Sequence, residues 1–354
     1  MKAVRIFDHG GVDKLVYGDF PMPEIGPRDV RVQVTATGVS LWDIKYRRGE
    51  LPVLPGRPAF PMPMQLGRDA AGRVEAVGRD VTAFAVGDRV VGLVHPANPA
   101  SALTVRGFGN LSTEIEYPGH TLFGGNAQFV ARPESYWMKL PSGASESAAA
   151  AALWSYSTAH RILADRLGAH LGDSVLLIGA SGGMGSATLD LAELMGLRVI
   201  AVTRSAQKKA FLEARGAAAV VVLSGKDDAA AVRAYADQLG VDGAIDYSGD
   251  PTMLKLAIDV LRPGGTLVVA AVEGGGGPVP LTTRDCLRLE INLRGARAST
   301  LNDQRCVIDL LGQGKIEPAI HTVLPLSAIG EAHTLLESGT VSGRILLDPW
   351  GERS

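Results

Sequence analysis

A glycine-rich turn between an apolar run and a helical pattern is the feature that most constrains how this chain folds. Residues 179–185 read GASGGMG; they follow the apolar run 174–178 and overlap the start of a helical pattern over 184–195. Glycines at a strand-to-helix turn let backbone N–H groups approach a pyrophosphate at the positive end of the helix dipole. Because the strand–helix–strand unit around it is complete, this turn predicts a dinucleotide site. The expected contacts are Ser181, Gly182, Gly183, Met184 and Gly185.

Strand and helix patterns alternate from about residue 141 onward. Buried-strand runs are found at 174–178, 198–202, 218–223, 242–247, 266–271 and 291–296, with helical patterns near 184–195, 205–215, 227–239 and 251–261. Strands joined by helices of this length form parallel sheets, because the chain must cross back before each new strand. The pattern predicts an α/β fold with a doubly wound, parallel, six-stranded sheet.

The first 140 residues have a different texture, with short strand patterns separated by Gly and Pro. Residues 30–36 alternate apolar and polar side chains, as in a half-buried strand. After residue 300 come two helical patterns and a short strand pattern at 344–347, too little to fold alone. We therefore predict a β-rich domain at 1–140, completed by 300–354, and a nucleotide-binding domain at 141–299.

Composition excludes several classes of protein. The net charge of −2 and the pI near 6.4 give no electrostatic basis for binding nucleic acid or an anionic membrane. No apolar run approaches the roughly 18 residues of a membrane span, and residues 1–16 lack the apolar core of a signal peptide. Two cysteines, Cys286 and Cys306, are too few for a disulfide framework. We expect a soluble, cytoplasmic enzyme with a small-molecule substrate.

The residues after the second strand of the nucleotide-binding pattern indicate which cofactor is bound. An acidic residue about 20 positions beyond the glycines would bind the ribose hydroxyls of NAD. Here the sequence is Thr203-Arg204-Ser205, with no carboxylate, and Lys208 follows. Hydroxyl and guanidinium groups suit a phosphate, so we predict NADPH. The alternative is that these side chains only decorate an exposed helix start.

Several motifs then point to a family. The chain resembles the medium-chain dehydrogenase/reductase superfamily over essentially its full length, and most closely the quinone oxidoreductase and enone reductase branch. The matching segments are 37–43 (TGVSLWD), 67–78 (GRDAAGRVEAVG), 84–90 (FAVGDRV), 179–185, 261–265 (LRPGG), 314–318 (GKIEP) and 342–345 (SGRI). The resemblance implies a GroES-like catalytic domain and a Rossmann domain. It also implies Thr158 near the nicotinamide amide, Val272 beside the ring, and a homodimer paired through residues 292–296, with a tetramer as the alternative.

The same resemblance shows what this chain lacks. Zinc-dependent members of the superfamily hold a catalytic zinc with Cys, His and a further Cys or acidic residue. The corresponding positions here are Ser40, Arg68 and approximately Trp154, none of them a good zinc ligand. The lobe that carries the structural zinc corresponds to 95–118, which has no cysteine. We predict no metal site, and we interpret the flanking His95 and His120 as structural.

Without a metal, the hydride acceptor must itself be electrophilic. A quinone or an α,β-unsaturated carbonyl meets this need, because the negative charge spreads onto an oxygen that hydrogen bonds stabilise. The candidate catalytic residues are Ser40, Trp42, Tyr46 and Arg68. Arg68 either polarises the acceptor oxygen or pairs structurally with Asp43 or Asp69. The alternatives are reduction of another activated carbonyl or an enoyl thioester, and a nucleotide-binding sensor or structural protein with little turnover. The thioester reading is weakened by Leu51, where enoyl thioester reductases carry a proton-donating Tyr.

Overall fold

The structure is a computed structural model that describes residues 1–51, 59–271 and 278–351. The chain forms two compact units, a first unit of Met1–Ser157 with Ala298–Ser354 and a second unit of Thr158–Arg297. The first division falls later than residue 140 because helix α3 (Glu146–Arg161) begins against the first unit. There, Glu146 pairs with Arg89 at 3.0 Å.

The second unit is built on a parallel sheet. Its strands are β9 (Ser174–Ile178), β10 (Arg198–Thr203), β11 (Ala219–Val222), β12 (Val241–Asp246), β13 (Leu261–Val269) and β14 (Asn292–Gly295). The spatial order is β11-β10-β9-β12-β13-β14, and every neighbouring pair is parallel. The predicted doubly wound, six-stranded sheet is therefore confirmed.

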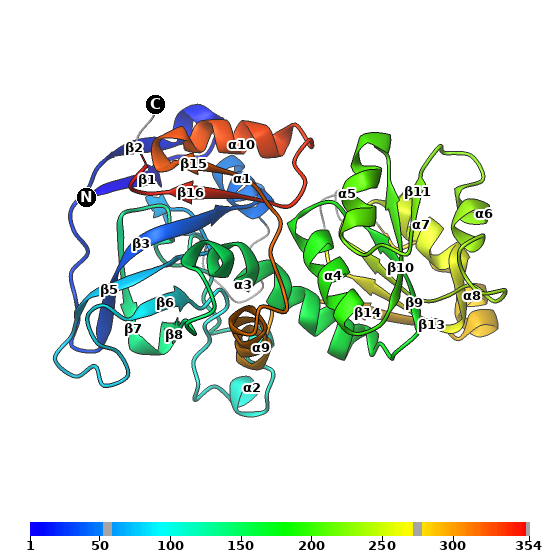
Figure 1. Ribbon diagram of the computed structural model, residues 1–354, viewed down its shortest axis with the longest axis horizontal. Coiled ribbons are helices and arrows are strands. Elements are labelled where there is room, and N and C mark those ends of the chain that lie inside the picture. The colour runs from blue at the N-terminus through cyan, green and yellow to red at the C-terminus, as the bar shows by residue number, and fades with distance from the viewer. Residues whose placement is uncertain (52–58, 272–277, 352–354) are drawn as a thin grey trace. The chain divides into compact units, whose positions relative to one another are not determined.

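Helices cover both faces of this sheet. Its helical segments are the end of α3, the π-helical η4 (Ile162–Leu167), α4 (Gly183–Leu194), η5 (Ala206–Lys208), α5 (Lys209–Ala214), α6 (Asp228–Arg233), α7 (Pro251–Val260) and α8 (Thr283–Leu289). Helices α4 and α5 lie on one face and α6 and α7 on the other (Figure 1). One buried cluster joins Leu176 and Ile200 of the sheet to Leu254 and Ala257 of α7. This packing fixes the carboxyl edge of the sheet, where the glycine turn emerges.

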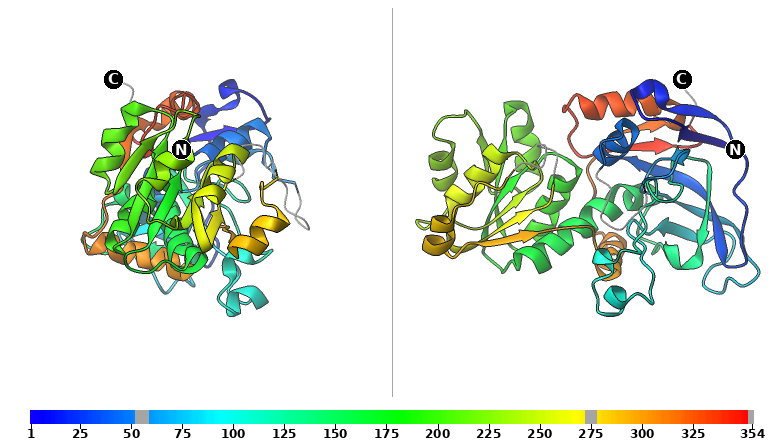
Figure 2. Two further views of the ribbon diagram at one scale, coloured as in Figure 1. Left: turned by 90° about the vertical axis from the view of Figure 1, so that its right-hand side faces the viewer. Right: turned by 180° about the vertical axis from the view of Figure 1, so that it is seen from behind.

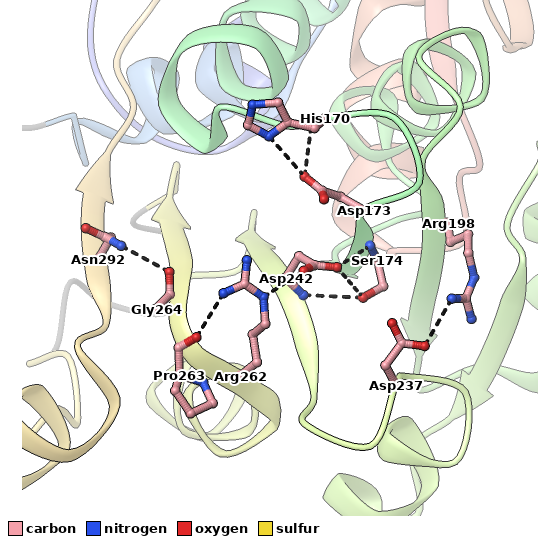
Figure 3. A network of polar contacts seen from close by, with 10 residues as sticks. All are labelled: His170, Asp173, Ser174, Arg198, Asp237, Asp242, Arg262, Pro263, Gly264 and Asn292. Carbon is pink, nitrogen blue, oxygen red and sulfur yellow. Dashed lines mark hydrogen bonds and ion pairs between the residues drawn. The ribbon is translucent and has the colours of Figure 1, made fainter.

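The amino edge of the same sheet is held by a network of polar contacts (Figure 3). The Asp242 carboxylate accepts hydrogen bonds from the backbone N–H (2.8 Å) and the hydroxyl (2.9 Å) of Ser174, and pairs with Arg262 at 2.7 Å. These bonds join β9, β12 and β13 where the strands begin. Burial raises the pKa of Asp242, but the bonds from Arg262 and Ser174 outweigh it and leave that pKa below its usual value.

We expect an Asp242→Asn variant to lose about 1–2 kcal/mol of unfolding free energy at neutral pH, because a charged, partly buried hydrogen-bond acceptor is lost. The pKa is lowered by folding, so this contribution is present above about pH 4 and disappears as the pH falls below it. Urea unfolding at pH 7 and pH 3 measures the difference. The matched control is Asp237→Asn, whose side chain is 73% exposed and pairs with Arg198 in the same network; it should change stability by less than about 0.5 kcal/mol. Equal losses in the two variants would contradict the prediction.

The first unit contains a seven-stranded and a three-stranded sheet. The larger joins β15 (Ile320–Pro325), β16 (Arg344–Asp348), β3 (Asp29–Val39), β5 (Ala71–Val77), β6 (Arg89–Gly92) and β8 (Trp137–Lys139), with β7 (Phe129–Pro133) on β3. The smaller joins β2 (Val16–Asp19), β1 (Lys2–Ile6) and β4 (Met64–Gln65). The helical segments are η1 (Val12–Lys14), α1 (Leu41–Arg48), α2 (Ala102–Val105), η2 (Gly109–Leu111), η3 (Glu134–Tyr136), α9 (Leu301–Gly312), η6 (Leu326–Ala328) and α10 (Ile329–Glu337).

The last segments of the chain complete the first unit. Strand β16 pairs antiparallel with β3 through Ile345 and Val39, and β15 pairs parallel with β16. Figure 2 shows the orange and red β15, β16 and α10 beside the blue N-terminal strands. The tail is therefore paired with the N-terminal part of the first unit through β16. No helix in the described part of the chain is long and apolar enough to cross a membrane.

Candidate active site and nucleotide-binding edge

The glycine turn has the geometry that a pyrophosphate needs. Gly179 adopts φ +79°, and a Cβ placed on Gly185 would collide with the Gly179 carbonyl oxygen, so glycine is required at both positions. Gly182 is the N-cap of α4 and provides no side chain to cap the helix. The first N–H groups of α4 are thus left without a side-chain acceptor, as an anion site requires. Residues 181–185 therefore fit a dinucleotide pyrophosphate.

The carboxyl end of β10 lies next to this turn, because β10 pairs with β9 as far as Val202 and Ile178. The Thr203 hydroxyl accepts a hydrogen bond from the Ser205 N–H at 3.1 Å. The Arg204 side chain is 74% exposed, and its ion pair with Asp250 is loose, at 3.9 Å. An exposed guanidinium with only a weak acidic partner fits an added phosphate.

The other expected cofactor residues are Lys208, Thr158 and Val272. Lys208 ends η5, and burial lowers the pKa of its ammonium. Thr158 lies in α3 where the second unit begins. Val272 lies outside the described residues.

Ser40 is part of a helix cap in the first unit. Its hydroxyl donates to the Asp43 carboxylate at 2.7 Å, and the Ser40 N–H donates to the same oxygen at 2.8 Å, forming the capping box of α1. The other Asp43 oxygen accepts from the Gly67 N–H at 3.1 Å. Asp43 is fully buried, which raises its pKa despite these bonds. The hydrogen of the Ser40 hydroxyl is therefore committed to the fold and is not free to donate to a substrate carbonyl.

Arg68 places a buried cation at the centre of the candidate site. Its side chain is 4% exposed, and the guanidinium carbon lies 4.3 Å from the Trp154 ring centre and 4.9 Å from that of Tyr117. One terminal nitrogen is 2.7 Å from Nδ1 of His120 and the other is 3.4 Å from Nε2 of His95. Burial lowers the pKa of Arg68 to about 10, so it stays charged at neutral pH.

Arg68 has no direct carboxylate partner in the described structure. Its neighbour Asp69 pairs instead with Arg344, which leaves the two acidic residues nearest in sequence, Asp43 and Asp69, engaged elsewhere. The suggested structural pairing of Arg68 with either residue is therefore not formed as a direct contact. The guanidinium is held by two imidazoles and two aromatic faces, and it keeps its Nε–H without a hydrogen-bond partner among the described residues.

His120 brings the predicted aromatic residues together. Its ring stacks on Tyr46, with centres 5.2 Å apart, and lies 6.5 Å from Trp42 and 6.2 Å from Phe60. The Tyr46 hydroxyl donates to the Pro61 carbonyl at 2.5 Å, and burial raises the pKa of this phenol. Tyr46 thus serves the packing here, and its proton is held by the backbone.

Of the four catalytic candidates, Trp42, Tyr46 and Arg68 meet around His120, and Ser40 is linked to them through Asp43 and the Gly67 backbone. His95 and His120 are buried within this cluster, and both contact Arg68. Interpreting them as structural residues from the sequence did not predict these contacts. Nothing in the local sequence reveals this, because they lie 27 and 52 residues from Arg68.

Comparisons with known proteins identify the family. Residues 26–142 match the alcohol dehydrogenase GroES-like domain, and residues 183–313 match the zinc-binding dehydrogenase domain. The chain belongs to the medium-chain dehydrogenase/reductase superfamily. Its first unit is thus GroES-like, and its second is a Rossmann domain that binds a nicotinamide dinucleotide; the chain is an oxidoreductase of this superfamily.

The relatives differ in their activities. A quinone oxidoreductase of Pseudomonas aeruginosa is 28% identical, with 98% of this chain and 99% of that protein covered. The structure of an NAD-dependent alcohol dehydrogenase has a TM-score of 0.91 and 30% identity, covering 98% and 99% of the two chains. A structure from Sinorhizobium meliloti 1021, described as a zinc-binding dehydrogenase bound to NADP, has a TM-score of 0.85 and 27% identity, covering 98% and 99%. Of eight similar curated proteins, six are alcohol dehydrogenases and two are quinone oxidoreductases.

The residues at the expected zinc position do not fit a zinc ion. Zinc takes thiolate, imidazole or carboxylate ligands, whereas here the Arg68 side chain, charged at neutral pH, lies against Trp154, and the Ser40 hydroxyl is bound to Asp43. The described residues contain no group of three or more His, Cys, Asp or Glu side chains arranged to hold a metal. A zinc ion beside the guanidinium would meet a like charge in a buried setting.

Proposed function

We propose that this protein is an NADPH-dependent oxidoreductase that transfers hydride to a quinone or an α,β-unsaturated carbonyl without zinc. The observation that carries the proposal is Arg68, a charged guanidinium buried between Trp154 and Tyr117 at the position of a zinc ligand. A fixed positive charge in a low-dielectric site stabilises an oxyanion as it forms. The aromatic surroundings favour a planar, conjugated acceptor.

When bound, NADPH supplies the hydride. Residues 181–185 would hold its pyrophosphate, and Arg204 with Thr203 and Ser205 its 2′-phosphate. The acceptor gains a C–H bond at its electrophilic carbon while its π electrons move onto oxygen, where Arg68 balances the charge. Water then protonates the resulting anion; with a quinone, loss of the new C–H proton and protonation of oxygen convert this product to the hydroquinone, a two-electron reduction in each case.

Oxidation of simple alcohols is less well supported by this site. That reaction in the superfamily relies on a metal that lowers the pKa of a bound alcohol and stabilises the alkoxide. A guanidinium beside the alcohol oxygen withdraws far less electron density than zinc, although it can stabilise the more delocalised anion of an enone or quinone. Trp154 and Ser40 add no metal ligand.

The test is NADPH oxidation, followed by absorbance, with 9,10-phenanthrenequinone and a series of alkyl enones, against oxidation of primary and secondary alcohols with NADP⁺. We expect turnover with conjugated acceptors only, unchanged after dialysis against 1,10-phenanthroline. Stoichiometric zinc in fresh protein, or metal-dependent alcohol oxidation, would overturn the proposal. Tight NADPH binding without turnover of any acceptor would instead support the nucleotide-binding sensor.

Replacing Arg204 by alanine is expected to raise the dissociation constant for NADPH by about 10–100-fold and to leave that for NADH nearly unchanged. Only the phosphorylated cofactor presents a group that the exposed guanidinium can bind. Quenching of protein fluorescence measures both constants. The control is Arg198→Ala, an exposed arginine at the start of β10, the strand that ends just before Arg204; its partners, Asp237 and the Tyr235 carbonyl, lie at the amino edge. Equal weakening of NADH binding would contradict the assignment.

We also propose a homodimer formed through β14. This strand is at one edge of the six-stranded sheet, and Leu293 on it is 44% exposed. An edge that no other described strand pairs, carrying an exposed apolar side chain, is suited to pairing with a second copy across a two-fold axis. A Leu293→Lys variant analysed by light scattering tests this, and a wild-type mass of one chain would exclude it.

A further inference from the structure

We infer that His120 is a catalytic residue whose Nε2–H donates a hydrogen bond to the oxygen that becomes negative when a conjugated carbonyl accepts hydride. The inference rests on the proposed function and adds to it a second donor beside Arg68.

The contact between Arg68 and His120 fixes the position of the imidazole proton. A guanidinium has only donors, so the His120 Nδ1 at 2.7 Å must accept and carries no hydrogen. An imidazole that accepts at Nδ1 is neutral and carries its single hydrogen on Nε2. Burial, followed by the nearby charge of Arg68, also lowers the pKa of His120 well below its usual value, in agreement with a neutral ring.

This Nε2–H group has no acceptor in the described part of the protein. The nitrogen is buried, and His120 as a whole is 2% exposed. An unpaired buried donor destabilises the fold, and a bound ligand that accepts from it removes that cost. The neighbouring Arg68 Nε–H is also buried and unpaired. Because Nδ1 faces Arg68, the Nε2–H points to the other side of the ring, so an oxygen bound there would feel the charge of Arg68 through the imidazole.

The rings around His120 indicate the shape of the ligand. Trp42 and Phe60 are half-buried, whereas Tyr46 is 1% exposed and held by its hydroxyl. To reach Nε2, an acceptor would have to displace the rings of Trp42 and Phe60 and replace their contacts with its own flat surface. A planar enone or quinone satisfies both the stacking and the hydrogen bond.

The chemical step remains balanced with this donor. The acceptor carbon gains the hydride, the carbonyl π electrons move to oxygen, and the Nε2–H···O bond strengthens as charge develops there. A neutral imidazole is too weak an acid to give up this proton, so His120 keeps it and water supplies the proton of the product. Its role is that of a fixed dipole in an oxyanion site.

The first experiment examines the resting protein and does not depend on activity. Long-range ¹H–¹⁵N spectra of protein labelled with ¹⁵N-histidine report which ring nitrogen carries hydrogen, and the His120→Phe variant assigns the signals. We expect a neutral His120 with hydrogen on Nε2 and a hydrogen-free Nδ1 at neutral pH. Hydrogen on Nδ1, or a charged ring, would overturn the inference.

The second experiment compares three variants with 9,10-phenanthrenequinone and an alkyl enone. His120→Phe keeps the ring and removes the donor, and should lower kcat by about 10²-fold. His120→Asn offers Arg68 an acceptor near the former Nδ1 but has no donor at the former Nε2, so it should be equally impaired. His120→Gln extends an amide N–H toward that place and should recover about a tenth or more of the wild-type kcat.

NADPH affinity and Tm separate loss of catalysis from loss of folding in all three variants. If wild-type protein turns over no conjugated acceptor, the proposed function fails. The spectra of the resting protein still decide independently which His120 nitrogen carries the hydrogen. If wild-type protein is active and His120→Phe matches its kcat, the inference on His120 fails while the proposed function survives. Activity in His120→Asn equal to that of His120→Gln would likewise overturn the inference.

Discussion

An Arg68→Met variant is expected to lose about 10³-fold in kcat/KM for conjugated acceptors. The substitution removes the buried charge and its donors but keeps a flexible apolar chain to fill the space against Trp154 and Tyr117. Loss of an oxyanion donor in a water-poor site typically costs 10²–10³-fold, and the positive charge adds to that. Steady-state kinetics with 9,10-phenanthrenequinone measure the effect. NADPH affinity should stay within about twofold, because the glycine turn belongs to the other unit.

The pH profile separates charge from packing at this position. Burial lowers the pKa of Arg68 to about 10, so wild-type activity should fall as the pH rises through that value and the guanidinium loses its proton. A lysine in the same setting starts from an ordinary pKa about two units lower. The Arg68→Lys variant should therefore be active only at lower pH, with its alkaline limb displaced by about two units. An Arg68→Met variant with the wild-type rate, or identical alkaline limbs in wild type and Arg68→Lys, would contradict a charge-based role.

Acidification from pH 8 to pH 5 is expected to cost the first unit about 2 kcal/mol of unfolding free energy through His333 alone. This residue of α10 is fully buried, and neither ring nitrogen has a hydrogen-bond partner among the described residues. Burial, then the charge of Arg47, lowers its pKa to about 3. Unfolded His333 binds a proton below about pH 6.5 and the folded ring does so only near pH 3, so stability falls as the pH drops through this window.

The matching experiment is the Tm of wild type and of His333→Leu between pH 8 and pH 4. Leucine has similar volume and no proton to bind. Between pH 8 and pH 5 the Tm of the variant should therefore fall by roughly 4–8 °C less than the Tm of wild type. Of the two acidic residues of α10, Glu337 already pairs with Arg47 and Arg48 of α1, and neither Glu337 nor Glu331 gives His333 a hydrogen bond. His321→Leu, at an exposed position of β15, is the control and should follow wild type. Parallel acid limbs in wild type and His333→Leu would exclude this role.

Local signals in the sequence were sufficient to predict much of the secondary structure of the second unit. The apolar run of β9, the glycine turn and the periodicity of α4 are contiguous, and each needs only its own neighbours to form. The capping box at Ser40 also has a local signature, a Ser followed three residues later by Asp43, but the resemblance drew attention to Ser40 as a replaced metal ligand. Strand β15 carries little alternation of buried and exposed residues, and the sequence did not indicate it.

The centre of the candidate site depends on contacts that no local pattern encodes. His95, His120 and Trp154 reach Arg68 from separate segments, and only the folded first unit brings them within 5 Å or closer of its guanidinium. Tyr46 is a second example. Its hydroxyl was expected to donate to the substrate, but in the fold it donates to the backbone carbonyl of Pro61. The catalytic and cofactor roles themselves stay predictions until the variants above are measured.

The position of β16 has a consequence for how the protein is made. This strand lies between β3 and β15 inside the larger sheet of the first unit, yet it is synthesised after every other strand. During translation the Rossmann unit has its whole sequence available before β16 is made, whereas Thr37–Val39 of β3, beyond the pairing with β7, must wait for β16. A ribosome-bound chain should therefore present a folded nucleotide-binding unit beside an unfinished catalytic one. Pairing of β16 with β3 and β15 then closes the sheet of the catalytic unit.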